Sequence, residues 1–301
     1  MRPAERPSAL PATETLDPAT AKIDELDGVA LASLLVDAHR GAVDAALAAA
    51  PQIARATEVV VDAIERGGRI VLVGAGTSGR LAVLDAAELP PTFGVDPGLV
   101  EGRIAGGDAA LRRAIEGAED DADAGLRAVD DVTREDVVIG VSASGGAPFV
   151  RAAVLAARER GARTIGIVNA PSGPLAADAD VGIVAATGAE PLQGSTRMRA
   201  GTAQKIVLNA ISTGAMVRLG KTYGNRMVDL VATNAKLRAR SERLVRDIAG
   251  PHADARALLD AAGGSVKLAI VMARRGVDRA EAERLLRAAH GRLAGVIGAP
   301  G

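Results

Sequence analysis

The stretch that decides the fold is RIVLVGAGTSGRLAVLDAAE, which runs from Arg69 to Glu88. An apolar run at 70–73 precedes the glycine-rich segment GAGTSG at 74–79, and a helical pattern follows it. The dinucleotide pattern G-x-G-x-x-G has the same order of strand, glycine loop and helix. Unpaired N–H groups and the positive end of the dipole favour an anion at such a helix start. The stretch therefore predicts an α/β protein that holds a phosphate group.

A second loop of similar chemistry follows another apolar strand. SASGG at 142–146 comes after the run 137–141 and precedes a predicted helix at 149–160. Ligands of parallel sheets bind beyond the carboxyl ends of the strands, so we expect the two loops to converge. Two hydroxyl-rich loops suit a terminal monophosphate, whose three oxygens accept several O–H and N–H bonds. The candidate phosphate ligands are Thr77, Ser78, Ser142, Ser144 and the amide of Gly145.

A nicotinamide enzyme is the alternative that the first loop leaves open. Glu101 stands near the position where dinucleotide-binding folds place the acid that binds the ribose. The second, hydroxyl-rich loop weighs against this alternative. The Walker pattern of nucleotide hydrolases is absent, and the serine hydrolase elbow G-x-S-x-G is not met around Ser142.

Apolar segments alternate with helical patterns through the first part of the chain, which is typical of a parallel sheet covered on both faces. One of the helices is expected to begin at a Gly106-Gly107-Asp108 cap and to run through Ile115 towards Glu119. The predicted strands are 70–73, 99–104, 137–141, 164–168 and 181–184.

The chain is expected to divide into an arm, an α/β domain and a small helical domain. Residues 1–26 are rich in proline and lack periodicity, which predicts an extended arm. Residues 27–250 hold the α/β domain; its first part, 27–67, reads as two helices and its last part as helices at 202–219 and 227–248. Residues 251–301 contain three short amphipathic segments, which predict the small helical domain.

Composition excludes several classes of function. Among the 301 residues, 48% are hydrophobic and 24% charged, as in ordinary soluble proteins. Aromatic residues make up 1% and the net charge is -1, which argues against a nucleic-acid-binding protein. Without cysteine there is no thiolate nucleophile and no Cys-based metal site. No apolar segment suits a secretory signal or a membrane span, so we expect a cytoplasmic protein.

Longer blocks of the sequence resemble one family. In chain order they are similar to segments of the N-acetylmuramic acid 6-phosphate etherases, which have the sugar isomerase (SIS) fold. The resemblance implies an SIS-type three-layer α/β fold with a parallel sheet flanked by helices, followed by a UBA-like helical domain at 251–301. One departure is Ala147, which stands where the SIS loop usually has Thr. The blocks are GAGTSGRLAVLDAAELPPTFGV, IAGGDAALRRAIEGAEDD, GAEPLQGSTRMRAGTAQK, ISTGAMVRLGK and MVDLVATNAKL.

The family cleaves the D-lactyl ether of its substrate by elimination and hydration, releasing D-lactate and N-acetylglucosamine 6-phosphate. This chemistry needs a base for the C2 proton and an acid for the departing C3 oxygen, which two carboxyl groups supply without metal or cofactor. The resemblance makes Glu88 of DAAELPP the acid and Glu119 of EGAED the base. Ala87 and Leu89 are expected to give Glu88 an apolar setting. The residues alone predict that the acidic cluster around Glu119 is a solvent-exposed surface, and only the resemblance singles out Glu119.

The resemblance also assigns Glu190 and Lys205 to substrate binding, where they would orient the sugar or the lactyl carboxylate. It further implies a homodimer, for which the helical segments 31–50 and 206–219 are candidate contacts. Two alternatives stay open. One is a sugar-phosphate aldose–ketose isomerase, which needs no acid at C3; the other is a sugar-phosphate-binding regulator without catalysis.

Overall fold

The computed structural model describes residues 11–229 and 235–300, and these form two compact units. The first unit consists of the chain up to Ala87 together with Gly98–Ile211. The second consists of Glu88–Pro97 and the chain from Ser212 onward. The second unit therefore begins well before residue 251, the boundary expected from the sequence.

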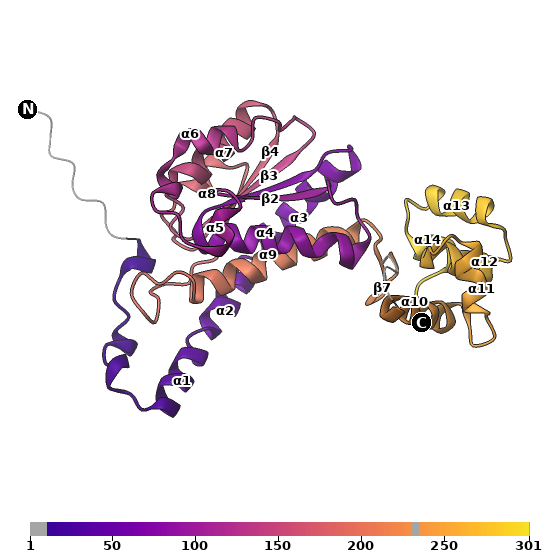
Figure 1. Ribbon diagram of the computed structural model, residues 1–301, viewed down its shortest axis with the longest axis horizontal. Coiled ribbons are helices and arrows are strands. Elements are labelled where there is room, and N and C mark those ends of the chain that lie inside the picture. Colours follow the sequence, from indigo (N-terminus) through magenta and orange to yellow (C-terminus); the bar gives the residue numbers. More distant parts are fainter. Residues whose placement is uncertain (1–10, 230–234, 301) are drawn as a thin grey trace, which may run out of the picture. The chain divides into compact units, whose positions relative to one another are not determined.

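The first unit is built on a parallel sheet of five strands in the order β2-β1-β3-β4-β5. Figure 1 labels β2, β3 and β4 of this sheet among the helices that surround it. β1 and β3 are buried along their whole length, because helices cover the sheet on both faces. All of the predicted strands are confirmed, with small shifts at their ends. The strands are β1 (Ile70–Gly74), β2 (Val100–Ile104), β3 (Val137–Ser142), β4 (Arg163–Val168) and β5 (Val181–Val184).

Helices pack on the sheet through small aliphatic side chains. Phe149, Val150 and Val154 of α7 share one buried cluster with Val71 and Val138 of the strands. α3 contacts β1, β3, β4 and β5. The helices of this unit are α1 (Gly28–Asp37), α2 (Arg40–Ala48), α3 (Ala50–Glu65), α4 (Gly76–Phe93), α5 (Ala109–Arg112), α6 (Ala122–Arg127), α7 (Pro148–Glu159), α8 (Leu175–Asp178) and α9 (Arg199–Arg218), of which α4 and α9 continue into residues of the second unit.

The strand order changes direction between β1 and β3, and this is where such sheets bind ligands. Gly74 at the end of β1 is in register with Val141 near the end of β3. The two hydroxyl-rich loops therefore leave neighbouring strands at the same edge of the sheet, as the sequence predicted.

Residues 11–26 are not an extended arm. They contain three one-turn helices, η1 (Ala12–Glu14), η2 (Pro18–Thr20) and η3 (Ile23–Glu25). The segment is anchored because the carbonyl of Thr13 accepts the N–H of Gly194 at 3.2 Å, and Gln193 Nε2 donates to the carbonyl of Glu14 at 2.9 Å. These are contacts between residues distant in sequence, so no local pattern announces them.

Two predicted helices differ in the structure. The helix expected from Asp108 to Glu119 is reduced to α5 and the single turn η4 (Ala118–Asp120). α5 ends before Arg113, whose backbone is extended, and Arg80 donates to the carbonyls of Leu111 and Arg113, at 3.4 and 3.3 Å. Instead of a helix over 227–248, a hairpin of β6 (Thr222–Tyr223) and β7 (Arg226–Met227) precedes a helix that begins at Ala235; residues 230–234 of the predicted helix lie outside the described residues.

The second unit packs short helices around its own apolar core. Leu244, Val245 and Ile248 of α10 belong to the same buried cluster as Ile270, which is why α10 joins the C-terminal helices. Lys267 is buried here; its Nζ donates to Asp229 and to the carbonyl of Gly291, both at 2.8 Å, and burial lowers its pKa below the ordinary value. The helices are α10 (Ala235–Ala249), α11 (Ala255–Ala261), α12 (Val266–Arg275), α13 (Arg279–Ala288) and α14 (Leu293–Ile297).

Candidate active site

The first hydroxyl-rich loop is shaped by close packing of backbone on backbone. A Cβ on Gly74 would stand 2.7 Å from the nitrogen of Gly79, and one on Gly79 would stand 2.5 Å from Ile104 Cγ1. Only glycine allows α4 to begin so close to the end of β1. Thr77 and Ser78 consequently lie in the first turn of α4, where unpaired N–H groups and the helix dipole favour an anion.

The second loop is held by its own hydroxyl groups. Ser142 Oγ accepts the N–H of Gly145 at 3.1 Å, and Ser144 Oγ accepts the N–H of Gly146 at 3.1 Å. Each hydroxyl acts as acceptor in these bonds and keeps its own proton for donation to a ligand oxygen. The two serines are therefore oriented as donors before any ligand binds.

Neighbouring backbone braces this loop from behind. The N–H groups of Asn169 and Ala170 both donate to the carbonyl of Ala143, at 2.9 and 3.0 Å. Asn169 is fully buried, and its side-chain amide donates to the carbonyl of Ala185 at 3.0 Å. The loop after β3 is thus tied to the ends of β4 and β5, which limits its movement.

The two candidate carboxylates belong to different units. Glu88 lies in α4 within the segment Glu88–Pro97 of the second unit, and Glu119 lies in η4 of the first. Glu88 is exposed. The apolar setting expected for its carboxyl group is therefore not provided by burial within this chain.

Glu119 is exposed, but the turn that carries it is anchored on both sides. Ala118 packs against the core cluster that α7 shares with the sheet. Gly117 has a φ of 71°, which allows the sharp entry into the turn. Asp121, which follows, caps α6 by accepting the N–H of Ala124 at 2.8 Å. Within this acidic cluster the structure thus gives Asp121 the role of a helix cap, a role that Glu119 does not share.

Glu190 is fully buried and both of its oxygens accept backbone N–H groups, from Arg199 and Ala200, each at 2.8 Å. These contacts make it the cap of α9. Lys205 lies on the same helix and is half-buried.

The contacts of Glu101 exclude it from the ribose-binding role of the nicotinamide alternative. It is in register with Val71, close to the amino end of β1 and thus at the opposite end of the strand from Gly74. Its carboxylate instead pairs with Arg103 at 2.7 Å and with Arg69 at 3.6 Å. The acid that a dinucleotide fold needs near the glycine loop is used here in an ion-pair network.

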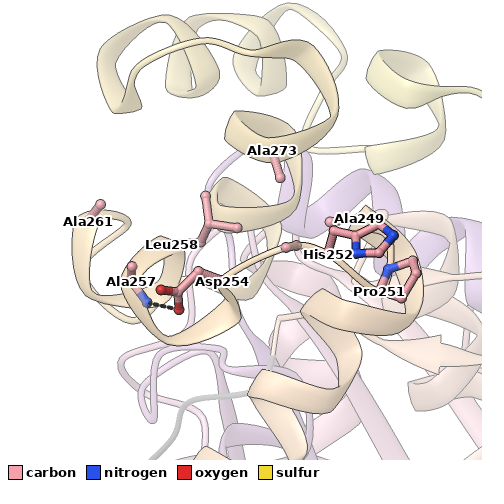
Figure 2. A pocket seen from close by; sticks show the side chains of 10 residues that line it. Ala249, Pro251, His252, Asp254, Ala257, Leu258, Ala261 and Ala273 are labelled. Atoms are coloured by element: carbon pink, nitrogen blue, oxygen red, sulfur yellow. Dashed lines mark hydrogen bonds between the residues drawn. The ribbon is translucent and has the colours of Figure 1, made fainter.

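A pocket of about 600 Å³ lies in the second unit (Figure 2). Five of its ten lining residues are alanine, and the others include Leu258, Pro251 and His252. Asp254, one of its polar members, accepts the N–H of Ala257 at 3.1 Å and so caps α11. None of the candidate site residues lines it.

The described residues, 11–229 and 235–300, lack two kinds of feature. They contain no group of three or more His, Asp or Glu side chains arranged to hold a metal ion. In the same residues, no helix combines the length and apolar character needed to cross a membrane.

Sequence reasoning missed Arg80, Asn169 and Gln204. Arg80 holds the segment that leads to Glu119, and Gln204 Nε2 donates to Asn169 Oδ1 at 2.9 Å. The only signal for Arg80 was its place in the GTSGR block. Asn169 directly follows a strand, which is the position where ligand-binding loops begin.

Comparison with known proteins gives two kinds of match. The model of the glucokinase regulatory protein N-terminal SIS domain matches residues 52–158, and the SIS domain model matches residues 118–213. Among solved structures, a phosphoheptose isomerase from Francisella tularensis superposes with a TM-score of 0.51 at 18% identity, covering 64% of this chain and 100% of the other. This likeness shows the fold.

Full-length relatives are more similar. A protein of Deinococcus radiodurans named N-acetylmuramic acid 6-phosphate etherase is 50% identical over 289 residues, 95% of each chain. One of Yersinia pestis (strain Pestoides F) with the same name is 47% identical over 93% of this chain and 96% of its own. The similarity therefore extends over both units.

Proposed function

This chain belongs to the N-acetylmuramic acid 6-phosphate etherase family, and from that premise we propose that it cleaves the D-lactyl ether of N-acetylmuramic acid 6-phosphate. The products are N-acetylglucosamine 6-phosphate and D-lactate, which makes the protein a carbon–oxygen lyase. The observation that carries the proposal is 50% identity over 95% of both chains. Two hydroxyl-rich loops at the strand-order switch support the phosphate part of it.

The 6-phosphate binds where the two loops leave β1 and β3. Thr77, Ser78, Ser142 and Ser144 donate hydroxyl protons to its oxygens, and the Gly145 amide lies in the second loop. Several such bonds to one dianion are charge-assisted and stronger than neutral ones. Glu190 and Lys205 belong to the substrate-binding set, Lys205 as a cation suited to a carboxylate and Glu190 through α9.

The reaction proceeds in two stages on the open-chain sugar. Glu119 removes the C2 proton, the electron pair forms the C2–C3 double bond, and the C3–oxygen bond breaks. Glu88 protonates the departing lactate oxygen. Glu119 then releases this proton to solvent, takes a proton from the water that adds to C3 and passes it to C2, while Glu88 regains its own proton from solvent. The C1 aldehyde makes the C2 proton acidic enough for a carboxylate, so the scheme uses no metal or cofactor.

We also infer that the enzyme is cytoplasmic, acts in amino-sugar catabolism and peptidoglycan recycling, and works as a homodimer. α1 supports the dimer: all of its residues are described, none is buried, and the apolar Val29 and Val36 are 81% and 74% exposed. An apolar helix left uncovered by its own chain is typical of a protein–protein contact.

The decisive experiment incubates the purified protein with N-acetylmuramic acid 6-phosphate and measures D-lactate. We expect stoichiometric lactate and N-acetylglucosamine 6-phosphate. A parallel incubation with fructose 6-phosphate addresses the isomerase alternative, and isomerised hexose without lactate would refute the proposal. Binding of the sugar phosphate without turnover would instead favour the non-catalytic regulator. The match to the glucokinase regulatory protein domain model is the observation that favours this alternative.

Glu88→Gln and Glu119→Gln test the roles of the two carboxylates. Each substitution keeps the shape of the side chain and removes the transferable proton or base, so we expect lactate release to fall by about 10²- to 10⁴-fold. The affinity for N-acetylglucosamine 6-phosphate should stay within about threefold, which is well under 1.4 kcal/mol. Glu116→Gln, in the same acidic stretch as Glu119, is the control and should retain full activity.

A further inference from the structure

The first turn of α9 is held by a buried carboxylate. Glu190 is 0% exposed; its Oε2 accepts the N–H of Arg199 and its Oε1 the N–H of Ala200, each at 2.8 Å. A helix start leaves these N–H groups without partners, and here one side chain from the preceding loop satisfies two of them. This carboxylate therefore holds the N–H groups of the helix start, while the guanidinium of Arg199 anchors the same turn by donating to the carbonyl of Ala38 at 2.8 Å.

The next residue of α9 lies against the first phosphate loop. A Cβ placed on Gly201 would stand 3.4 Å from Thr77 Cγ2 and 3.9 Å from Leu81 Cδ1. Glycine at 201 lets the helix approach the first turn of α4 within van der Waals contact. A shift of α9 would be transmitted directly to Thr77.

The following turn of α9 reaches the second loop. Gln204 is 1% exposed, and its Nε2 donates to Asn169 Oδ1 at 2.9 Å. The backbone N–H of Asn169 donates in turn to the carbonyl of Ala143, inside the loop, at 2.9 Å. One helix thus contacts the supports of both loops.

We propose that Glu190 is a positioning residue for phosphate binding: by capping α9 it fixes the helix that sets the spacing of the two hydroxyl-rich loops. The proposal rests on the proposed function only in taking those loops as the phosphate site. It assigns to Glu190 no contact with the reacting atoms.

Replacing the carboxylate by an amide should disturb this arrangement. In Glu190→Gln one oxygen becomes an NH₂ group, which would face an N–H donor of the helix start, and two donors cannot bond. The first turn of α9 must then move, and Thr77 with it. Phosphate affinity should suffer more than the folded state as a whole.

Asp136 offers a matched control. It is also a buried acid, 4% exposed, whose two oxygens accept backbone N–H groups from Arg69 and Thr133, both at 2.9 Å. It directly precedes β3 and so lies at the sheet edge opposite the loops. Asp136 also accepts from Thr133 Oγ1 at 3.2 Å and pairs with Arg69 Nε at 3.5 Å, so Asp136→Asn disturbs at least as many bonds where no phosphate is expected.

The test compares wild type, Glu190→Gln and Asp136→Asn by titration calorimetry with N-acetylglucosamine 6-phosphate and by thermal unfolding. We expect both variants to lose thermal stability. Only Glu190→Gln should weaken binding of the ligand. We expect about a tenfold loss of affinity, which corresponds to the loss of one or two hydrogen bonds at the start of α9. Unchanged affinity in Glu190→Gln, or an equal loss in Asp136→Asn, would overturn the proposal.

A second variant covers the case in which Glu190→Gln does not fold. Gln204→Met keeps the shape and removes the bond to Asn169, and we expect about a threefold loss of affinity for the same ligand; unchanged affinity would count against α9 as the brace. The readout is independent of catalysis. If wild type binds the sugar phosphate but releases no lactate from N-acetylmuramic acid 6-phosphate, the proposed function fails while the comparison of affinities still decides the positioning role.

Discussion

At position 147 a methyl group stands where the resemblance to the SIS loop implies a Thr hydroxyl. Ala147 is the N-cap residue of α7, and an alanine side chain offers no bond to the exposed N–H groups of that helix. The position also closes the second phosphate loop. A hydroxyl here would serve either the helix or a bound phosphate.

Ala147→Thr should therefore increase either the stability of the fold or the affinity for the substrate. Capping α7 would stabilise the fold by about 1 kcal/mol, and a bond to the phosphate would tighten substrate binding by a similar free energy, about 1 kcal/mol. Urea unfolding with and without N-acetylglucosamine 6-phosphate separates the two. Ala147→Val, β-branched but without the hydroxyl, should gain neither; an equal gain in Val would show that shape and not hydrogen bonding matters.

Gly145 illustrates a residue whose identity the backbone dictates. Its φ is +73°, and a Cβ there would stand 2.7 Å from Gly173 Cα and 2.9 Å from Val168 Cγ1. Gly145→Ala should cost about 1–3 kcal/mol of stability through strain and should raise KM by displacing the amide in the loop. Gly146→Ala is the adjacent control, because the nearest atom to its Cβ would be Ser144 Oγ at 3.6 Å. Equal stability of the two variants would contradict this reading.

At the scale of elements, an ion-pair network joins the edge strand β2 to the loop after α6. Asp131 accepts hydrogen bonds from Arg103 and Arg69, at 2.6 Å each, and these bonds hold its pKa well below the ordinary value. A carboxyl group whose pKa is lowered by folding stabilises the protein above its unfolded pKa, and the contribution is lost as the pH falls.

The first unit should thus lose stability as the pH falls below about 5, through the ordinary carboxyl pKa and further down, and Asp131→Asn should flatten that part of the curve. Asp131 is 46% exposed, so solvent screening limits the effect to about 1 kcal/mol. Urea midpoints at a series of pH values measure it. A variant whose stability falls as steeply as that of wild type would show that other carboxylates cause the loss.

The elements themselves were predictable to different degrees. β1 and β3 are apolar over their length and buried between two layers, so their composition predicts them, whereas the edge strand β2 carries Glu101 and Arg103 and is buried only at its ends. The helix expected after Asp108 ends after the short α5, where the guanidinium of Arg80, remote in sequence, donates to the carbonyls of Leu111 and Arg113. The local sequence pattern cannot predict a hydrogen-bond partner that is so distant in sequence.

At the scale of the whole molecule, the uncovered helix α1 bears on oligomeric state. Val36 of α1 and Val43 of α2 are 74% and 56% exposed. If they lie in the dimer contact, Val36→Glu with Val43→Glu should yield a monomer in light scattering with little loss of thermal stability, since neither side chain is buried within the chain. Leu126→Glu, 46% exposed on α6, is the control and should stay dimeric. A dimeric double variant would place the interface elsewhere.

The division into two units was the feature that the sequence predicted least well. The sequence marks the C-terminal helices by their amphipathic patterns, but it does not show that α10 shares their core or that Glu88–Pro97 is grouped with them. The shared core follows from apolar side chains that meet across long separations in sequence.

By itself the sequence determined the parallel sheet, the two hydroxyl-rich loops and the family, because apolar runs, the positions of glycine and hydroxyl residues and extended motif blocks can be read along the chain. Only the tertiary structure decided that Glu190 caps α9, that Asn169 braces the second loop and that Glu101 is taken by arginines. A charged or amide side chain can serve a ligand or the backbone with the same atoms. Which of the two it serves depends on the partner that folding brings within hydrogen-bond distance.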